Sequence, residues 1–413
     1  MERLSSAQDR VVDVNEMPIG QLIRLYRINR KMTMAQVATH AGISARYLEM
    51  IESGTKTPSV PTLRRIARAL GVRTSALISD VPSEDHAAPA NSRLSSVERA
   101  LYGYGSPLDA SAEPPDLADL AARVDAARTA WFLSPNKFSD ILAVLPDLIV
   151  DAEHAVRAYD RSREACRLAA EVYRLAPGVC KQAGRVELCG LLADRAMRYA
   201  EETADPVLIA AAGWTVGHAM LAGDMPEGGL EVAMRAAERF KPLLPDGTPE
   251  MFSVYGGLLL CAGLAYVRAG EASRGRKMLR GPAREVAKRV GEGRNHYGTV
   301  FGPTNVAIHE VMFATDTGEI SDALRFADEV HIAAIPSLER RTTYLYKVAR
   351  CHEQRGNDAA VLVHLQMAYR QCPQDFQYKH EPQRLLASLV RRARSSFATE
   401  VRDFAAKVGV IPQ

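Results

Sequence analysis

Residues 32–59 read MTMAQVATHAGISARYLEMIESGTKTPS, and this stretch decides the fold of the first part of the chain. Its pattern predicts two short helices joined by a tight turn. Thr33 and Ser44 are side-chain oxygens placed to cap the two helices. The turn falls at Gly42, because glycine adopts backbone conformations that other residues resist. Apolar residues recur at helical spacing on one side of both helices: Val37, Ala38, Ala41, Leu48 and Ile51.

The opposite side of the second helix is mostly polar. Arg46, Glu49, Met50 and Ser53 fall on this side and are predicted to face outward. A helix held from behind by apolar side chains, with polar side chains presented from its first turns, is what reading base edges in a DNA major groove requires. The stretch is therefore predicted to be a helix-turn-helix motif.

The flanking sequence predicts three further helices. Residues 19–31 and 60–71 have apolar residues at helical spacing, and residues 73–78 suggest a fifth, short helix. Five helices within about 60 residues make a complete small domain. We therefore assign residues 17–80 to this domain and residues 1–16 to a flexible arm.

Charge is unevenly distributed along the 413 residues. The net charge is only +3, but residues 17–80 contain ten Lys and Arg against three acidic residues, which gives this segment +7 and leaves −4 for the remainder. A basic domain on a mildly acidic body suits binding to a polyanion. The length predicts two or three domains, and the low aromatic content of 6% favours helices over sheets.

Signals for catalysis, metal binding and membrane insertion are absent from the sequence. The six cysteines contain no CxxC pair, and mostly lie in apolar helical patterns, where cysteine packs as a small hydrophobic residue. We find no P-loop, GxSxG or HExxH motif. The first residues do not resemble a signal peptide, and no run approaches the ~20 apolar residues that span a bilayer. We expect a cytoplasmic protein without enzymatic activity, cofactor, metal or membrane contact.

Residues 81–95 (VPSEDHAAPANSRLS) lack apolar periodicity and are predicted to be a linker. From residue 96 to 413 the sequence is a series of helical patterns without a convincing strand. A Gly followed by a polar residue recurs at Gly184, Gly223, Gly270, Gly318 and Gly356, with separations of 39, 47, 48 and 38 residues. Each Gly is predicted to mark the turn of an antiparallel helix pair, and such periods indicate a helical solenoid.

The last of these turns shows tetratricopeptide (TPR) spacing most clearly. Small residues and a closing proline occur at the TPR positions Ala349, His352, Gly356, Leu365, Ala368 and Pro373. The predicted fold class is therefore all-α, with an N-terminal five-helix domain and a C-terminal TPR-like α-solenoid over residues 96–413.

Residues 19–79 resemble the XRE/lambda-repressor-type DNA-binding domain. The matching positions are Thr33, Ala38, Ala41-Gly42-Ile43-Ser44, Ile51-Glu52, Gly54, Pro58-Ser59, Leu63, Ile66-Ala67 and Leu70-Gly71-Val72. The resemblance implies a structural ion pair between Arg27 on the first helix and Glu52 at the end of the recognition helix. The chain departs from the family at Met34, where members often carry a glutamine that contacts a phosphate or a neighbouring side chain.

The order of the two parts also resembles a group of regulators. An XRE domain followed by a TPR-like body is similar to actinobacterial XRE/TPR regulators and, more loosely, to the peptide-sensing RRNPP type. Residues 295–310 particularly resemble the actinobacterial group. The resemblance implies that the solenoid binds a small effector and mediates dimerisation.

The recognition helix supplies the candidates for DNA contact. Arg46 is the leading candidate for reading a base, because a guanidinium can bond O6 and N7 of guanine together. Ala45 and Met50 could pack against a thymine methyl, and Glu49 could accept from cytosine. The residues expected at phosphates are Thr33, Ser44, Tyr47 and Lys56. Each could instead be a solvated surface residue.

Candidates for effector binding come from the solenoid. Asn305 and His309 are four residues apart, so they project from the same side of a helix. The other candidates are mainly aromatic or basic residues: Trp214, His218, Tyr255, Tyr297, Phe301, Arg340 and Tyr344. The alternative is that these side chains only pack between helices.

These features together predict a sequence-specific transcriptional regulator. It would bind a double-stranded DNA operator as a homodimer, and its TPR-like part would dimerise and sense a small molecule or peptide. The alternative is a DNA-tethered adaptor whose solenoid binds a protein partner. A deep pocket near Asn305 and Tyr344 would favour sensing of a ligand.

Overall fold

The computed structural model describes residues 18–72, 74–77, 88–103 and 113–410, and every regular element in these ranges is a helix. The chain divides into two units, residues 1–83 and 84–413. The first unit contains α1 (Ile19–Asn29), α2 (Met34–Ala41), α3 (Ala45–Glu52), α4 (Val60–Leu70) and α5 (Thr74–Leu77). The predicted all-α class and five-helix first domain are confirmed. The predicted arm, residues 1–16, lies outside the described residues.

The helices of the first unit begin and end at the residues that their sequence predicts. The Thr33 hydroxyl accepts from the Gln36 amide at the start of α2, and the Ser44 and Ser59 hydroxyls cap α3 and α4 in the same way. Gly42 ends α2 in the left-handed conformation, with φ of +61°. The core of the unit contains the apolar residues predicted for the motif: Val37, Ala38, Ala41, Leu48 and Ile51.

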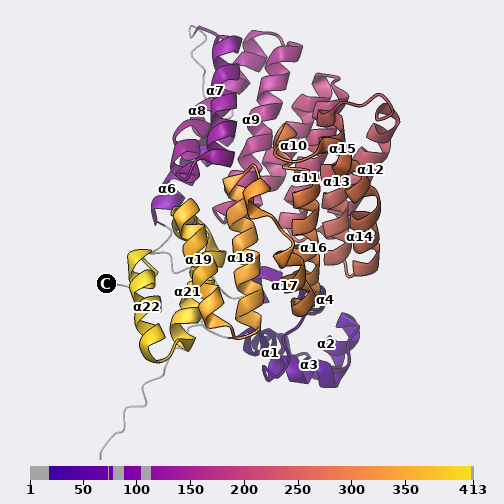
Figure 1. The fold of residues 1–413 in the computed structure, drawn as a ribbon. Coiled ribbons are helices and arrows are strands. Elements are labelled where there is room, and N and C mark those ends of the chain that lie inside the picture. Colours follow the sequence, from indigo (N-terminus) through magenta and orange to yellow (C-terminus); the bar gives the residue numbers. More distant parts are fainter. Residues whose placement is uncertain (1–17, 73, 78–87, 104–112, 411–413) are drawn as a thin grey trace, which may run out of the picture. The chain divides into compact units, whose positions relative to one another are not determined.

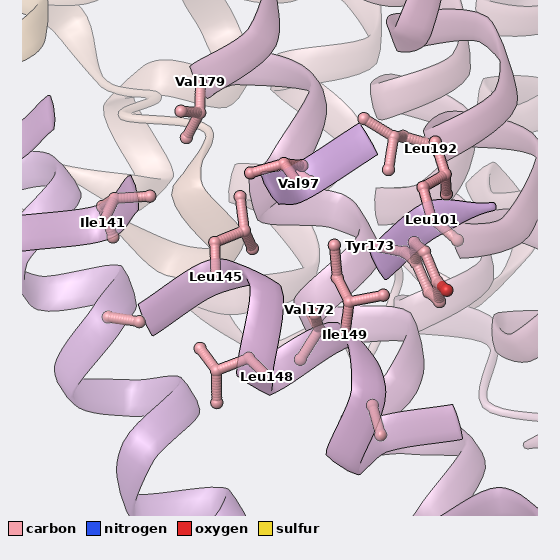
Figure 2. Packing of buried hydrophobic residues seen from close by; sticks show 14 of the residues in the cluster. Val97, Leu101, Ile141, Leu145, Leu148, Ile149, Val172, Tyr173, Val179 and Leu192 are labelled. Carbon is pink, nitrogen blue, oxygen red and sulfur yellow. The ribbon is translucent and has the colours of Figure 1, made fainter. Parts of the chain in front are cut away.

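The second unit begins within the segment predicted to be a linker. Residues 81–87 of that segment lie outside the described residues, but residues 88–95 belong to α6 (Ala88–Leu101) rather than to a linker. Leu94, Val97 and Leu101 are almost fully buried. Figure 2 shows Val97 and Leu101 among apolar side chains of α8 and α9. The composition of the segment hid this helix, because the first large apolar residue of the helix is Leu94.

The rest of the second unit is a stack of antiparallel helices (Figure 1). Its α-helices are α7 (Leu117–Leu133), α8 (Lys137–Ala158), α9 (Arg163–Gln182), α10 (Val186–Glu202), α11 (Pro206–Ala222), α12 (Pro226–Phe240), α13 (Pro249–Arg268), α14 (Ala272–Met278), α15 (Arg284–Val290), α16 (Pro303–Thr317), α17 (Ile320–Asp328), α18 (Leu338–Gln354), α19 (Asp358–Gln371), α20 (Asp375–Tyr378), α21 (His380–Arg392) and α22 (Ser395–Lys407). Short 3-10 or π segments are Lys241–Leu243, Leu279–Ala283, His296–Gly298 and Ile332–Ala334.

The five predicted glycine turns all lie between the two helices of a pair. They join α9 to α10, α11 to α12, α13 to α14, α16 to α17 and α18 to α19. Four of the glycines have a positive φ, but Gly223 does not, and its neighbour Asp224 adopts φ of +62° instead. Successive pairs pack on one another, which is the arrangement of a helical solenoid.

The two ends of this solenoid meet. Helix α7 contacts α18, and the segment around α20 packs against the start of α8. The Phe138 and Tyr378 rings stack with centroids 4.4 Å apart, and the Gln374 amide oxygen accepts from the Phe138 backbone at 3.0 Å. Lys137 and Asp375 form an ion pair of 2.8 Å in which both side chains are fully buried. The solenoid is therefore closed on itself.

Helix α13 corrects one expectation. It is long and apolar enough to cross a membrane, whereas the sequence was expected to contain no such run. Of its most apolar window, 83% is buried inside the protein, and other helices of the stack surround it. A buried central helix of a globular unit needs the same apolar composition as a membrane span.

Candidate nucleic-acid interface and ligand cavity

Helix α3 is fixed in place by its inner side. Leu48 and Ile51 are 0% and 1% exposed, while Ala45, Arg46 and Glu49 lie on the exposed side. Burial of this apolar side leaves the helix no freedom to rotate about its axis, because rotation would expose the apolar residues to water. The polar side chains therefore stay on the outer surface.

The predicted ion pair between Arg27 and Glu52 is present. The guanidinium is bidentate: Arg27 Nε and Nη2 each donate to a Glu52 carboxylate oxygen at 2.7 Å. The hydrogen bond to Glu52 raises the pKa of Arg27, against a smaller opposing effect of burial. Because the Glu52 side chain is only 5% exposed, the pair joins α1 to the end of α3 and does not face outward.

Six of the eight predicted DNA-contact residues are exposed and two are only partly exposed. Besides the three outer residues of α3, the exposed members are Thr33, Ser44 and Lys56. Tyr47 and Met50 are only partly exposed, and Tyr47 packs against the core of the unit. Within the described part of the chain neither Arg46 nor Lys56 forms an ion pair, so a phosphate or a base edge could approach them.

Sequence analysis missed the role of Gln36, an exposed residue at the start of α2. The Gln36 side chain accepts a hydrogen bond from the Thr33 backbone at 2.8 Å, while the Gln36 amide donates to the Thr33 hydroxyl at 3.2 Å. This reciprocal pair is a capping box, and the spacing of Thr33 and Gln36 was its signal. Met34, which departs from the family pattern, packs against the core.

The second unit contains a cavity of about 440 Å³ inside the closed solenoid. Its walls come from α7, α9, α11, α13, α16 and α18 and from the segment that closes the solenoid. A cavity of this volume is in the range that accommodates a small organic ligand. Five of the predicted effector-binding residues line it: Trp214, His218, Tyr297, His309 and Arg340.

The other four predicted effector-binding residues do not line this cavity. Tyr255 and Tyr344 are buried in the apolar core, and the Tyr344 hydroxyl donates to the Ala327 carbonyl. Phe301 lies against Gly256, where a Cβ would come within 2.1 Å of its ring. Asn305 faces the preceding loop and donates to the Thr299 carbonyl at 3.4 Å. A deep pocket near Asn305 and Tyr344 is therefore not found among the described residues: Asn305 lines a separate recess of only about 10 Å³, and the large cavity lies around His218.

Basic groups predominate on the cavity wall. Seven Lys and Arg side chains line it against three glutamates. Most of the seven are paired; Lys347, for example, bonds Glu381 at 3.0 Å and Arg174 bonds Glu171 at 3.0 Å. Lys181 and Arg340 have no hydrogen-bond or ion-pair acceptor for their side chains in the described part of the chain, and Arg340 Nε is buried there without a partner.

The positive charges act on one another inside the cavity. Burial and the nearby Arg268 guanidinium lower the pKa of Lys181 to about 8. Burial, Lys181 and Arg340 together hold the pKa of His218 well below its usual range, so this imidazole is neutral at pH 7. The Lys181 side chain is exposed, and its surface lines the cavity.

The loop between α15 and α16 lines the cavity and has a strained backbone. Tyr297 and Val300 both have φ of +51°, a conformation that costs energy for any residue with a Cβ and most for a β-branched one. Arg174 holds the loop by donating to the Tyr297 carbonyl at 2.6 Å, and the Asn295 side chain accepts from the Val300 amide at 3.0 Å. Both strained residues line the cavity.

Sequence analysis missed the charged residues that α9 contributes. Glu171, Arg174, Gly178 and Lys181 all line the cavity, and their spacings of three and four residues place them along one side of a helix. The signal was therefore a polar stripe at helical period on a helix whose other side is apolar.

His309 gives the cavity wall a pH-dependent stability. Its Nδ1 lies 2.8 Å from the Asn305 carbonyl, so this nitrogen carries the hydrogen and donates it. Burial, aided by Arg340, lowers the pKa of His309 to about 3. The unfolded chain takes up the proton near pH 6.5 and the folded chain does not, so stability is lost as the pH falls below that value.

We expect the free energy of unfolding to fall by about 2 kcal/mol between about pH 7 and about pH 5 through His309 alone. His309→Gln keeps a donor for the Asn305 carbonyl. It should remove the part of the pH dependence of the free energy of unfolding that His309 causes. Denaturant unfolding of both proteins at the two pH values measures the difference. An equal loss in both would show that His309 is not the group responsible.

Comparison with known proteins places the first unit in a family. Residues 20–81 match the family described as "Helix-turn-helix domain". The chain is 41% identical over 64 residues to the immunity repressor protein of Bacillus phage phi105, which is 16% of this chain and 44% of that protein. It is 40% identical over 60 residues to the HTH-type transcriptional regulator SlrR of Bacillus subtilis, covering 14% of this chain and 40% of that protein. The similarity spans less than half the length of these relatives.

The alignment with one solved structure covers more of the chain, but at lower sequence identity. The structure is that of Bacillus thuringiensis PlcR in complex with the peptide PapR7 and DNA, and it covers 83% of this chain and 98% of that chain at 11% identity. The TM-score is 0.32, which does not establish a shared fold.

The family match falls on the residues whose caps, turn and ion pair are described above. It includes α2, the Gly42 turn and α3 together with the Arg27–Glu52 pair. The first unit of this chain therefore matches the helix-turn-helix domain family.

Proposed function

We propose that this chain is a sequence-specific DNA-binding transcriptional regulator. The observation that carries the proposal is the exposed outer side of α3, where Arg46 has no acidic partner among the described residues and the helix is fixed from behind by Leu48 and Ile51. The excess of basic residues in this unit supports attraction to a polyanion. The regulator would act in the cytoplasm, on a double-stranded operator.

The second unit is proposed to sense a small molecule or peptide and to dimerise. Support for sensing comes from the cavity, which is enclosed by helices from both ends of the solenoid and carries unpaired polar groups on its wall. A dimer would place two recognition helices on half-sites one helical turn or a multiple apart. An effector that changes the spacing of the two helices would then change affinity for the operator.

The alternative of a protein-binding adaptor has less support. An adaptor would use the concave face of an open solenoid. Here the ends of the solenoid meet through the buried Lys137–Asp375 pair, and the inner space is a cavity of small-ligand size. We therefore favour a ligand over a protein as the occupant.

Selection of bound sequences from a random duplex pool tests the DNA-binding proposal. We expect the selected operator to be an inverted repeat. Arg46→Ala should then lose about 1–3 kcal/mol of discrimination between this operator and random DNA, because a bidentate contact to a base is removed. Titration of both duplexes with both proteins measures this value.

Lys56→Ala is the matched control. Lys56 is an exposed basic residue of the same unit, and we expect it to contact a phosphate. The substitution should weaken binding to operator and random DNA alike and reduce the slope of log affinity against log salt by about one unit. Equal weakening of both duplexes by Arg46→Ala would contradict base reading by Arg46. Failure of the wild-type protein to select any sequence would reject the regulator.

A further inference from the structure

The proposed sensing site has a charge pattern that restricts its ligand. Lys181 comes from α9, Arg268 from α13 and Arg340 from α18, so three separate helices direct basic groups into one cavity. The positive charges of all three groups add to burial in lowering the pKa of His218 of α11. The basic groups therefore converge on one region of the wall near His218.

The protein itself compensates this charge incompletely. Arg268 lies 3.7 Å from Asp316, but the side chains of Lys181 and Arg340 have no acceptor in the described residues. Glu339 attracts both cations, but its carboxylate already accepts from Gln182 at 2.6 Å and from Thr343 at 3.1 Å. Cations that share a partly enclosed space without an acceptor repel one another, and an anion would relieve that repulsion.

The wall beside these cations is aromatic. The Trp214 and His218 rings meet edge to face with centroids 4.7 Å apart, and Trp131 and Tyr297 also line the cavity. An anionic head group at Lys181 and Arg340 would thus leave the rest of its molecule against flat apolar surfaces, which favour burial of a hydrocarbon or aromatic body.

We propose that the cavity binds an organic anion, with Lys181 and Arg340 as the partners of its carboxylate or phosphate group and Trp214 against its apolar part. This proposal rests on the sensing role proposed above and names the class of ligand. The anion can be a small carboxylic acid, a phosphate monoester or the carboxyl terminus of a short peptide, because all three present the same oxygen acceptors to a lysine and an arginine.

A fluorescent probe with this chemistry tests the proposal directly. 1-Anilinonaphthalene-8-sulfonate is an apolar anion, and N-phenyl-1-naphthylamine is a similar aromatic without the charge. The chain has two tryptophans, Trp131 and Trp214, and both line the cavity, so binding there is also visible in tryptophan emission. We expect the anionic probe to bind one site per chain, and Lys181→Met or Arg340→Met to weaken it about tenfold.

The binding should depend on pH through Lys181. The groups facing its ammonium are Arg268 of α13, Glu339 and Arg340 of α18, Cys189 of α10 and His218 of α11. With its pKa lowered to about 8, Lys181 is charged at pH 7 and loses its proton above pH 8. Affinity for the anionic probe should therefore fall about tenfold between about pH 7 and about pH 9. Lys181→Arg should keep the affinity and lose this pH dependence, because a guanidinium stays protonated.

Lys277→Met is the matched control, because Lys277 is an exposed lysine of the same unit that does not line the cavity. It should leave the probe's affinity unchanged. The neutral probe should respond to none of the substitutions. Equal binding of the charged and neutral probes, or unchanged binding of the anion by both Lys181→Met and Arg340→Met, would overturn the proposal.

Displacement of the bound probe identifies the source of the anion. 2-Naphthoate, 2-naphthyl phosphate and a hydrophobic tetrapeptide with a free carboxyl terminus are the three competitors, and 2-naphthamide and the amidated tetrapeptide are their neutral counterparts. At least one of the acids should displace the probe and its neutral counterpart should not. If an anion binds at Lys181 but operator affinity does not respond to it, the ligand class stands and the sensing role fails. If operator affinity responds to neutral ligands alone, the sensing role stands and the proposed ligand class fails.

Discussion

Asp375→Ala is expected to destabilise the second unit by about 3–5 kcal/mol, because it leaves two buried lysines without their acceptor. Asp375 is fully buried and forms ion pairs with Lys137 Nζ at 2.8 Å and Lys379 Nζ at 2.9 Å. The Tyr346 hydroxyl donates to the same carboxylate at 3.1 Å. Chemical unfolding followed by circular dichroism measures the change.

The electrostatics of Asp375 explain the size of this effect. Burial alone would raise the pKa of Asp375, but attraction to Lys379 and Lys137 outweighs burial and holds this pKa below its usual range. Burial lowers the pKa of Lys137, but attraction to Asp375, with smaller contributions from Cys372 and Glu339, outweighs burial and raises the pKa of that lysine. The charged forms therefore depend on one another, and removal of the carboxylate leaves an uncompensated charge on a side chain that water does not reach.

The same substitution should open the cavity. The Lys137–Asp375 pair joins the start of α8 to α20, and residues on both sides of this junction, such as Trp131 and Lys379, line the cavity. Tryptophan emission should therefore move toward that of solvent-exposed indole before global unfolding. Lys288→Ala is the control: its pair with Glu285 is 65% and 68% exposed, and the loss should be below about 0.5 kcal/mol. A similar small loss for Asp375→Ala would mean that the junction does not stabilise the unit.

Glu52→Ala is expected to abolish DNA binding without removing any DNA contact. Arg27 would be left without its bidentate partner next to the apolar core, at a cost of about 3 kcal/mol. A domain of about 60 residues has only a small margin of stability, so most of the helix-turn-helix domain would unfold at moderate temperature. The second unit, which contains neither residue, should keep its own unfolding transition.

Glu49→Ala separates stability from recognition, because Glu49 is on the same helix and exposed. It should alter the preferred operator and leave the melting temperature of the domain nearly unchanged. Differential scanning calorimetry of the full chain, with its two units, distinguishes the outcomes. If Glu52→Ala melts like the wild type, the pair is not structural, and an effect on DNA binding would then point to a direct role of Glu52.

The relation between sequence and structure differs between the two units. In the first unit the prediction was correct because its determinants are local: a cap is set by residues three positions apart, a turn by one glycine, and a buried side by i, i+4 spacing. In the second unit the glycine turns were correct for the same reason, although Asp224 took over the left-handed position beside Gly223. Turns at Asp160 and Ala204, which have positive φ without glycine, gave no such signal.

The sequence by itself therefore determined the helix-turn-helix motif and the order of the helix pairs, whereas the family resemblance supplied the Arg27–Glu52 ion pair. Only the tertiary structure decided which side chains share the cavity. Spacing placed Asn305 and His309 on the same side of α16, but neighbouring helices turn His309 to the cavity and Asn305 to the loop. The physical reason is that the cavity depends on contacts such as that of Phe138 with Gln374, 236 positions apart, whose pairing no local pattern of residues encodes.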